Sequence, residues 1–338
     1  MLFETAEAFE KALAKLPVPN EVHRLAAARR QDRLTKPPGS LGRLEEIARH
    51  LAGWHVDGIP RAKRVKVAVF AGNHGVTAQG VSPYPASVTQ QMVANFQSGG
   101  AAINAISSSL GLELQVVPLD LDKPTNDIAI GPAMSAAETL AALNAGADVV
   151  DEASDILVLG EMGIGNTTIG AALAAALLGG SASAWVGPGT GLDDAGVRHK
   201  AAVVEEALDL HRAFFGDPLE VLRRLGGREQ AALAGCIVEA RRRRIPVMLD
   251  GFICCASALV VQKLDPDGLA HCQIAHRSKE PGHARMIEAM GFEPILDLGM
   301  RLGEGSGAAV ALGILEAAVA CHNGMATFAE AGVAGRDD

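Results

Sequence analysis

A strand, a glycine-rich turn and a helix follow one another without a break near the middle of the chain. Residues 156–159 form a short apolar run, residues 160–168 (GEMGIGNTT) form the turn, and an Ala/Leu-rich stretch continues to Gly179. This order predicts a strand–loop–helix unit of an α/β fold. Glycines let the backbone approach a ligand closely, and a helix start offers unpaired N–H groups to an anion. The turn therefore predicts either an anion site or a tight connection that binds nothing.

The same turn fits the spacing of a P-loop with one substitution. From Gly160 to Thr167 it reads G-x-x-x-x-G-N-T, with Asn166 where a P-loop has lysine. That lysine neutralises the β- and γ-phosphates of a nucleoside triphosphate. Its absence argues against ATP or GTP and favours a single phosphate. We expect Asn166, Thr167 and Thr168 to cap the helix and to donate to phosphate oxygens.

Six further apolar runs with strand composition alternate with helical segments. We expect one strand at 155–159 and six more at 65–70, 114–118, 182–186, 245–249, 271–274 and 294–298. The intervals suit crossover helices, so the pattern predicts a Rossmann-like, mainly parallel sheet of about seven strands with helices on both faces. Helical patterns are expected at 4–16, 20–34, 41–54, 87–96, 135–144, 194–214, 229–243, 252–262, 281–290 and 308–321.

Composition and charge exclude several functional classes. The chain has 338 residues and a formal net charge of −9, which gives no electrostatic footprint for nucleic acid or an anionic membrane. Residues 1–16 lack the apolar core of a secretory signal, and the longest apolar runs are too short or interrupted to span a bilayer. The five cysteines are odd in number and form no CxxC, which predicts reduced thiols in a cytoplasm. His271, Cys272 and His276 fit no standard zinc spacing.

Glycine-rich or polar turns follow several of the expected strands. Because the carboxyl ends of parallel strands meet at one edge of the sheet, we expect these turns to line a cleft for a phosphate-bearing ligand. The turns lie at 71–76, 160–168, 187–194, 250–252, 276–283 and 299–307.

Three residues in these turns have alternative interpretations. Glu304 stands between glycines before a long apolar helix, so it is either a general base or an acid stabilised by the helix dipole. Glu161 has the same two interpretations. His74 is a general base, a substrate contact or a residue that holds its loop by bonding backbone.

Seven segments, in this order, resemble one known family. They are KPPGSLGRLE at 36–45, AGNHGVTAQGVSPYP at 71–85, VTQQMV at 88–93, GEMGIGNTT at 160–168, LDGF at 249–252, EPGH at 280–283 and RLGEGSGAA at 301–309. Together they resemble the nicotinate-nucleotide–dimethylbenzimidazole phosphoribosyltransferases over about residues 30 to 322. Lys279 departs from the family pattern, which has a small residue there. No G-x-G-x-x-G follows a first strand, which argues against a dinucleotide-dependent oxidoreductase.

The resemblance implies a fold and a reaction. It implies a large α/β domain at 61–305 and a small helical domain built from both chain ends, 1–60 and 306–338, in a homodimer. It implies transfer of the phosphoribosyl group of nicotinate mononucleotide to 5,6-dimethylbenzimidazole, giving α-ribazole 5′-phosphate and nicotinate for the lower nucleotide loop of cobalamin. No metal or other cofactor is expected, because the pyridine nitrogen of the donor is already cationic and nicotinate leaves unaided. A nucleotide hydrolase and a non-catalytic nucleotide sensor on the same fold remain alternatives.

The resemblance also implies roles for individual residues. Glu304 matches the base that deprotonates the attacking imidazole, and Glu161 is a candidate to stabilise the electron-deficient anomeric carbon and to hold the ribose. The phosphate and ribose contacts implied are Gly163, Gly165, Asn166, Thr167, Gly189, Lys200 and Ser278. The benzimidazole contacts implied are Ser82, Gln90, Met162 and Leu302.

Overall fold

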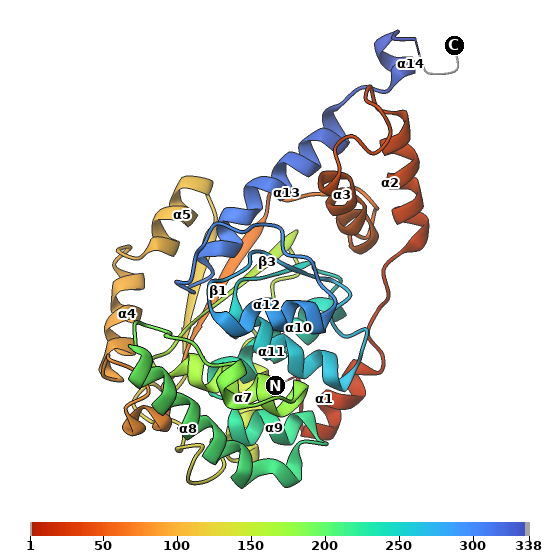
Figure 1. The fold of residues 1–338 in the computed structure, drawn as a ribbon. Coiled ribbons are helices and arrows are strands. Elements are labelled where there is room, and N and C mark those ends of the chain that lie inside the picture. The colour runs from red at the N-terminus through yellow and green to blue at the C-terminus, as the bar shows by residue number, and fades with distance from the viewer. Residues whose placement is uncertain (1, 335–338) are drawn as a thin grey trace.

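A single parallel sheet forms the centre of the part of the chain that the computed structural model describes, residues 2–334 (Figure 1). Its strands are β1 (Val65–Ala71), β2 (Glu113–Pro118), β3 (Ile156–Met162), β4 (Val247–Leu249) and β5 (Cys272–Ile274), in the order β2-β1-β3-β4-β5. β1 and β3 share the longest register, from Val65 opposite Ile156 to Ala71 opposite Met162. Both strands are buried almost throughout, as expected for parallel strands covered on both faces.

The prediction of about seven strands was wrong, because the sheet within residues 2–334 has five. Residues 182–186 instead begin with the 3₁₀ helix η2 (Ala182–Ala184), which is closed by a 2.9 Å hydrogen bond from the backbone N–H of Trp185 to the Ala182 carbonyl. The indole Nε1 of Trp185 also donates to the Gly179 carbonyl at 2.9 Å. Residues 294–298 run beside the end of β5 but make only one bridge, between His276 and Leu296. Pro294 offers no N–H to a ladder, so this segment does not extend the sheet.

Fourteen α-helices and two more 3₁₀ helices complete the described residues. They are α1 (Ala6–Leu13), α2 (Glu21–Arg33), α3 (Arg43–Trp54), η1 (Gly75–Gln79), α4 (Ser87–Gln97), α5 (Ala102–Leu110), α6 (Ala136–Ala147), α7 (Asn166–Leu178), α8 (Asp194–His211), η3 (Arg212–Phe214), α9 (Pro218–Leu225), α10 (Arg228–Arg242), α11 (Phe252–Leu264), α12 (Pro281–Met290), α13 (Ser306–Gly324) and α14 (Phe328–Ala331). Each predicted helix is present, the one at 281–290 with the predicted ends and the others with shifted ends, whereas α5, α9 and α14 were not predicted.

Alternate residues of each central strand face two separate cores. In β1, Ala68 and Phe70 join a large core with α7, α9, α10 and α11, whereas Val67 and Val69 join a smaller core with α3, α5 and α13. Side chains alternate between the two faces because successive residues of a strand point in opposite directions. Each face of the strand packs against an apolar core, which explains why the sequence shows a continuous apolar run.

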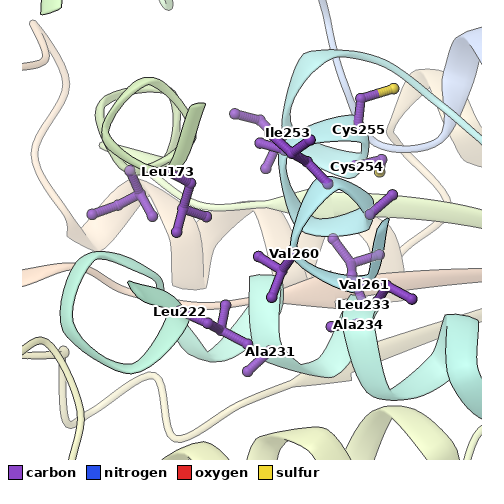
Figure 2. Packing of buried hydrophobic residues seen from close by; sticks show 14 of the residues in the cluster. Leu173, Leu222, Ala231, Leu233, Ala234, Ile253, Cys254, Cys255, Val260 and Val261 are labelled. Atoms are coloured by element: carbon purple, nitrogen blue, oxygen red, sulfur yellow. The ribbon is translucent and has the colours of Figure 1, made fainter. Parts of the chain in front are cut away.

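The large core is built by closely packed helices of small residues. Figure 2 shows α11 lying against α7, α9 and α10, with Val260 and Val261 facing the side of Leu222 and Leu233. α6 and α10 approach to backbone contact: a Cβ on Gly235 would lie 1.9 Å from the Leu143 carbonyl oxygen. The Ala- and Gly-rich composition therefore serves helix packing, since larger side chains would hold these helices apart.

The chain ends lie in two different places. α1 packs on the large core through Phe9, and Asn144 holds both the N–H and the carbonyl of Phe3. α2, α3 and the C-terminal half of α13 lie together at one end of the molecule, beyond the sheet (Figure 1). α13 is long and apolar enough to cross a membrane by length and composition alone. Helices in protein cores share this property, and 44% of the apolar 18-residue stretch of α13 is buried.

Candidate active site

A cleft of about 460 Å³ opens at the carboxyl end of the sheet. The loops that follow β3, η2, β4 and β5, together with the loop before α13, form its walls. This is the position at which open α/β sheets bind ligands. The lining residues are Tyr84, Glu161, Met162, Gly163, Ile164, Asn166, Thr167, Gly189, Thr190, Gly251, Phe252, Ile253, His276, Ser278, Glu280, Arg301, Leu302 and Gly303.

The turn between β3 and α7 contributes the start of a helix to this cleft. Gly165 is the N-cap, at a φ of 90° that favours glycine, so Asn166 is the first helical residue and not the predicted cap. The side-chain amide of Asn166 donates to Glu161 Oε2. Gly163, Ile164 and Thr167 line the cleft at this helix start, where the dipole favours an anion.

Lys200 lies behind this turn, outside the lining of the cleft. Its side chain is fully buried, and Nζ donates to Thr167 Oγ1 at 2.6 Å and to the Gly187 carbonyl at 3.2 Å. Burial lowers its pKa to about 8, and the carboxylate of Glu280 opposes that shift. Because Thr167 Oγ1 accepts from the lysine, the hydroxyl proton of Thr167 is left to donate toward the cleft.

Glu161 is a buried carboxyl group beside other acids. Burial raises its pKa well above the usual range, and the charges of Asp250, Glu229 and Glu304 add to that rise. The hydrogen bond from Asn166 acts in the opposite direction, since it stabilises the ionised form. Glu161 therefore gains a proton more readily than an exposed glutamate, and a cation in the cleft would favour its ionised form.

Glu304 is next to the cleft but is not part of its lining. The residue is 5% exposed, one carboxylate oxygen has no hydrogen-bond partner among the described residues, and burial followed by the charge of Asp250 raises its pKa. Its backbone adopts a φ of 65°, which costs a glutamate about 1–2 kcal/mol. Gly160 permits this conformation, because a Cβ there would lie 2.6 Å from the carbonyl carbon of Glu304.

Asp250 fixes the segment that carries Glu304. It follows β4 and accepts hydrogen bonds from the N–H groups of Gly305 at 3.2 Å and Ala308 at 2.9 Å, at the start of α13. Its Oδ1 also lies 3.5 Å from His276 Nε2, and His276 lines the cleft. The sequence marked Asp250 only as part of the LDGF segment and of the turn at 250–252. Its partners at the start of α13 lie more than 50 residues away in the chain, so no local pattern could reveal the contact.

The residues expected around a base fall into two groups. Met162 and Leu302 line the cleft, whereas Ser82 and Gln90 do not. Ser82 Oγ lies 3.1 Å from Thr190 Oγ1, at the edge of the cleft. Gln90 is exposed on α4, and its amide donates to Asp122 at 2.5 Å.

Several lining residues were not predicted individually. Tyr84, Phe252, His276, Glu280 and Arg301 come from segments that were recognised as turns or as family motifs, without a role for these residues. The Arg301 guanidinium donates to the Gly189 carbonyl at 2.7 Å and so ties two walls together. Lys279, which departs from the family pattern, is exposed and is not in the lining.

His74 holds its loop through a carboxylate. Its Nε2 lies 2.5 Å from Glu229 Oε1, and both side chains are fully buried. Gly163 packs directly against this pair, because a Cβ there would lie 3.0 Å from the histidine nitrogen and 3.1 Å from the glutamate oxygen. The pair therefore supports the floor of the cleft from below. In residues 2–334 no three His, Cys, Asp or Glu side chains are grouped as metal ligands.

Comparison with known proteins agrees with this geometry. A phosphoribosyltransferase family model matches residues 16–333. The nicotinate-nucleotide–dimethylbenzimidazole phosphoribosyltransferase of Novosphingobium aromaticivorans is 55% identical over 332 residues, covering 98% of both chains, and that of Mesorhizobium japonicum is 54% identical over 333 residues, covering 98% and 99%. A crystal structure of the Thermus thermophilus enzyme of that name superposes with a TM-score of 0.87 at 41% identity, covering 94% of this chain and 99% of the other. The chain therefore belongs to this phosphoribosyltransferase family.

Proposed function

We propose that this protein transfers the phosphoribosyl group of nicotinate mononucleotide to 5,6-dimethylbenzimidazole, giving α-ribazole 5′-phosphate and nicotinate for the lower nucleotide loop of cobalamin. The observation that carries the proposal is the 55% identity over 98% of both chains to an enzyme of that name. The cleft at the carboxyl end of the sheet supports it, with a helix start on one side and two buried acids beside it.

The donor phosphate is proposed to bind at the start of α7. Gly163, Asn166 and Thr167 line the cleft there, and the N-cap Gly165 adjoins this lining; their backbone N–H groups are the proposed donors. Lys200 adds positive charge from behind Thr167. Gly189 and Ser278, on the opposite loops of the cleft, complete the proposed phosphate and ribose contacts.

The proposed chemistry uses the two buried glutamates in different roles. The cationic pyridinium of the donor and the electron-deficient anomeric carbon favour the ionised form of Glu161, which then stabilises that charge. The attacking imidazole becomes cationic unless its other nitrogen loses a proton, and Glu304 is proposed to take it. A pKa raised by burial suits Glu304 for this role, because a base acts best near the working pH. Attack opposite to the leaving nicotinate gives the α-product, and the reaction as proposed needs no metal or other cofactor.

The acceptor is proposed to lie against Met162 and Leu302. These side chains line the cleft and offer apolar surface to a flat ring. Ser82 and Gln90 are the proposed polar partners of its nitrogens, and Gln90 would exchange its bond to Asp122 for one to the acceptor.

Nicotinate release from nicotinate mononucleotide, with and without 5,6-dimethylbenzimidazole, tests the proposal. Release that depends on the acceptor and yields α-ribazole 5′-phosphate is expected. Release without the acceptor would identify a hydrolase, and binding without release would identify a sensor.

Glu304→Gln tests the base. We expect the variant to fold normally and to lose on the order of 10²–10⁴ in kcat, the usual contribution of a general base. Glu288→Gln, an exposed glutamate on α12, is the matched control and should keep full activity. Equal turnover by the two variants would remove Glu304 from this role.

We also propose that the protein is a cytoplasmic homodimer whose small helical domain contains α2, α3 and the end of α13. Exposed apolar side chains gather there: Val22 is 73% and Val56 is 80% exposed, and Val18 and Val56 line one hollow. Such a patch marks an interaction surface. Light scattering should show a dimer, and Val22→Glu should shift it toward monomer; a monomeric unmodified protein would contradict this. The five free thiols fit a reducing compartment.

A further inference from the structure

A buried histidine behind the cleft bonds the backbone of a cleft-lining residue. His283, near the start of α12, is fully buried, and its Nδ1 accepts a 2.9 Å hydrogen bond from the N–H of Ser278. Accepting this bond requires a lone pair on Nδ1, so the ring proton is on Nε2. That nitrogen lies 3.2 Å from the Sγ of Cys255. Figure 2 shows where Cys255 lies in the first turn of α11.

The surroundings of His283 hold its ring in one orientation and one charge state. The ring of Phe252 meets it edge-on with centroids 6.3 Å apart, and His276 lies 6.4 Å away on the cleft side. Burial, helped by the charges of His276 and Arg277, lowers the pKa of His283 to about 3. The imidazole is therefore neutral at physiological pH, and Nδ1 keeps the lone pair that Ser278 needs.

The bond from Ser278 has a consequence for the cleft. Ser278 Oγ accepts a 3.3 Å hydrogen bond from the N–H of Glu280, so its own proton remains to donate elsewhere. Ser278 and Glu280 both line the cleft. The residue between them is held from the other side, because the N–H of Lys279 donates to the Met300 carbonyl at 2.9 Å. His283 thus fixes the first residue of a turn that presents two side chains to the ligand.

We infer that His283 is a positioning residue for the phosphoribosyl donor, acting through the backbone of Ser278 to aim the Ser278–Glu280 turn into the cleft. This inference rests on the proposed function, because it takes nicotinate mononucleotide as the ligand. Cys255 is a minor partner in it, since a thiol is a weak acceptor and the Ser278 N–H alone determines the tautomer.

Two amide variants that differ in length by one methylene group isolate the acceptor at Nδ1. In His283→Asn the side-chain oxygen can occupy the place of Nδ1, whereas in His283→Gln the amide reaches toward Cys255 and leaves the Ser278 N–H unpaired. We expect His283→Gln to raise both KM and the dissociation constant for nicotinate mononucleotide by about 10- to 100-fold, the usual result of an unpaired buried donor. His283→Asn should stay within about threefold of the unmodified enzyme, and Cys255→Ala, the matched control, should do the same.

The experiment combines steady-state kinetics with calorimetric binding of nicotinate mononucleotide in the absence of acceptor, and thermal melting of each variant. The expected result is weaker binding by His283→Gln than by His283→Asn, with kcat changed less than KM. Equal affinities of the two variants, or a fall in kcat at unchanged affinity, would overturn the role of His283. An unmodified protein that binds the nucleotide without turning it over would contradict the proposed function alone, and the order of the affinities would still test His283.

Discussion

Gly163→Ala is the substitution for which the structure predicts the most specific loss. Gly163 lines the cleft, and its backbone is not in the left-handed region, so alanine adds no conformational strain. The new Cβ would lie 2.7 Å from the Gly72 carbonyl oxygen, 3.0 Å from His74 Nε2 and 3.1 Å from Glu229 Oε1. All three neighbours are buried, and the nearest is backbone.

The size of the effect follows from these distances. Ordinary contact begins near 3.4 Å, so the loop after β3 must move away from Gly72 by several tenths of an ångström. Overpacking of this kind costs about 1–3 kcal/mol of stability. The same displacement moves the start of α7, and a misplacement of about 1 Å at an active site costs on the order of 100-fold in rate. We therefore expect kcat/KM to fall at least about tenfold.

The assay is nicotinate release, accompanied by thermal melting. Gly313→Ala is the control, because Gly313 lies in α13, is exposed, and a Cβ added to it would meet no atom within 4 Å. That variant should keep full activity and gain up to about 1 kcal/mol of stability. If Gly163→Ala matches the unmodified enzyme in both kcat/KM and melting temperature, the inferred contact between this loop and Gly72 is wrong.

The remaining predictions concern packing and pH. Gly235→Ala should lower the free energy of unfolding in urea by about 3 kcal/mol or more at unchanged KM, because its Cβ would lie 1.9 Å from the Leu143 carbonyl oxygen; a normal unfolding midpoint would contradict the close packing of α6 and α10. The pKa of His283 is about 3 in the folded state against 6.5 in the unfolded chain, so unfolding takes up a proton between these values and stability falls as pH falls through that window. The loss reaches about 3 kcal/mol at pH 4 and should be absent in His283→Asn, as acid-unfolding curves would show. Asp250→Asn removes a negative charge that raises the pKa of Glu304, so the acid limb of the kcat/KM profile should move to lower pH; an unmoved limb would exclude Glu304 as its source.

Local sequence patterns predicted the strand–turn–helix unit well because its determinants are adjacent in the chain. The branched run, the glycines and the Ala/Leu stretch form β3, the turn and α7, although β3 continues to Met162 and α7 begins at Asn166, so the turn is shorter than predicted. The pattern failed at 182–186, where apolar composition predicted a strand but the bond from the Trp185 N–H to the Ala182 carbonyl closes a 3₁₀ turn. It also failed at 294–298, where a few backbone hydrogen bonds and one bridge to the end of β5 form but no strand.

The sequence by itself determined the alternation of strands and helices, the position of the glycine-rich turns, and through its ordered segments the family. Those features depend on side-chain periodicity, backbone freedom and short motifs, all of which are local. Only the tertiary structure decided which polar groups meet. Asp250 contacts the start of α13, Lys200 reaches Thr167 from behind, and Glu229 pairs with His74. Each contact joins residues at least 33 positions apart, so it exists only after the sheet has brought the strand ends to one edge, and burial there gives the carboxyl groups of the cleft their raised pKa values.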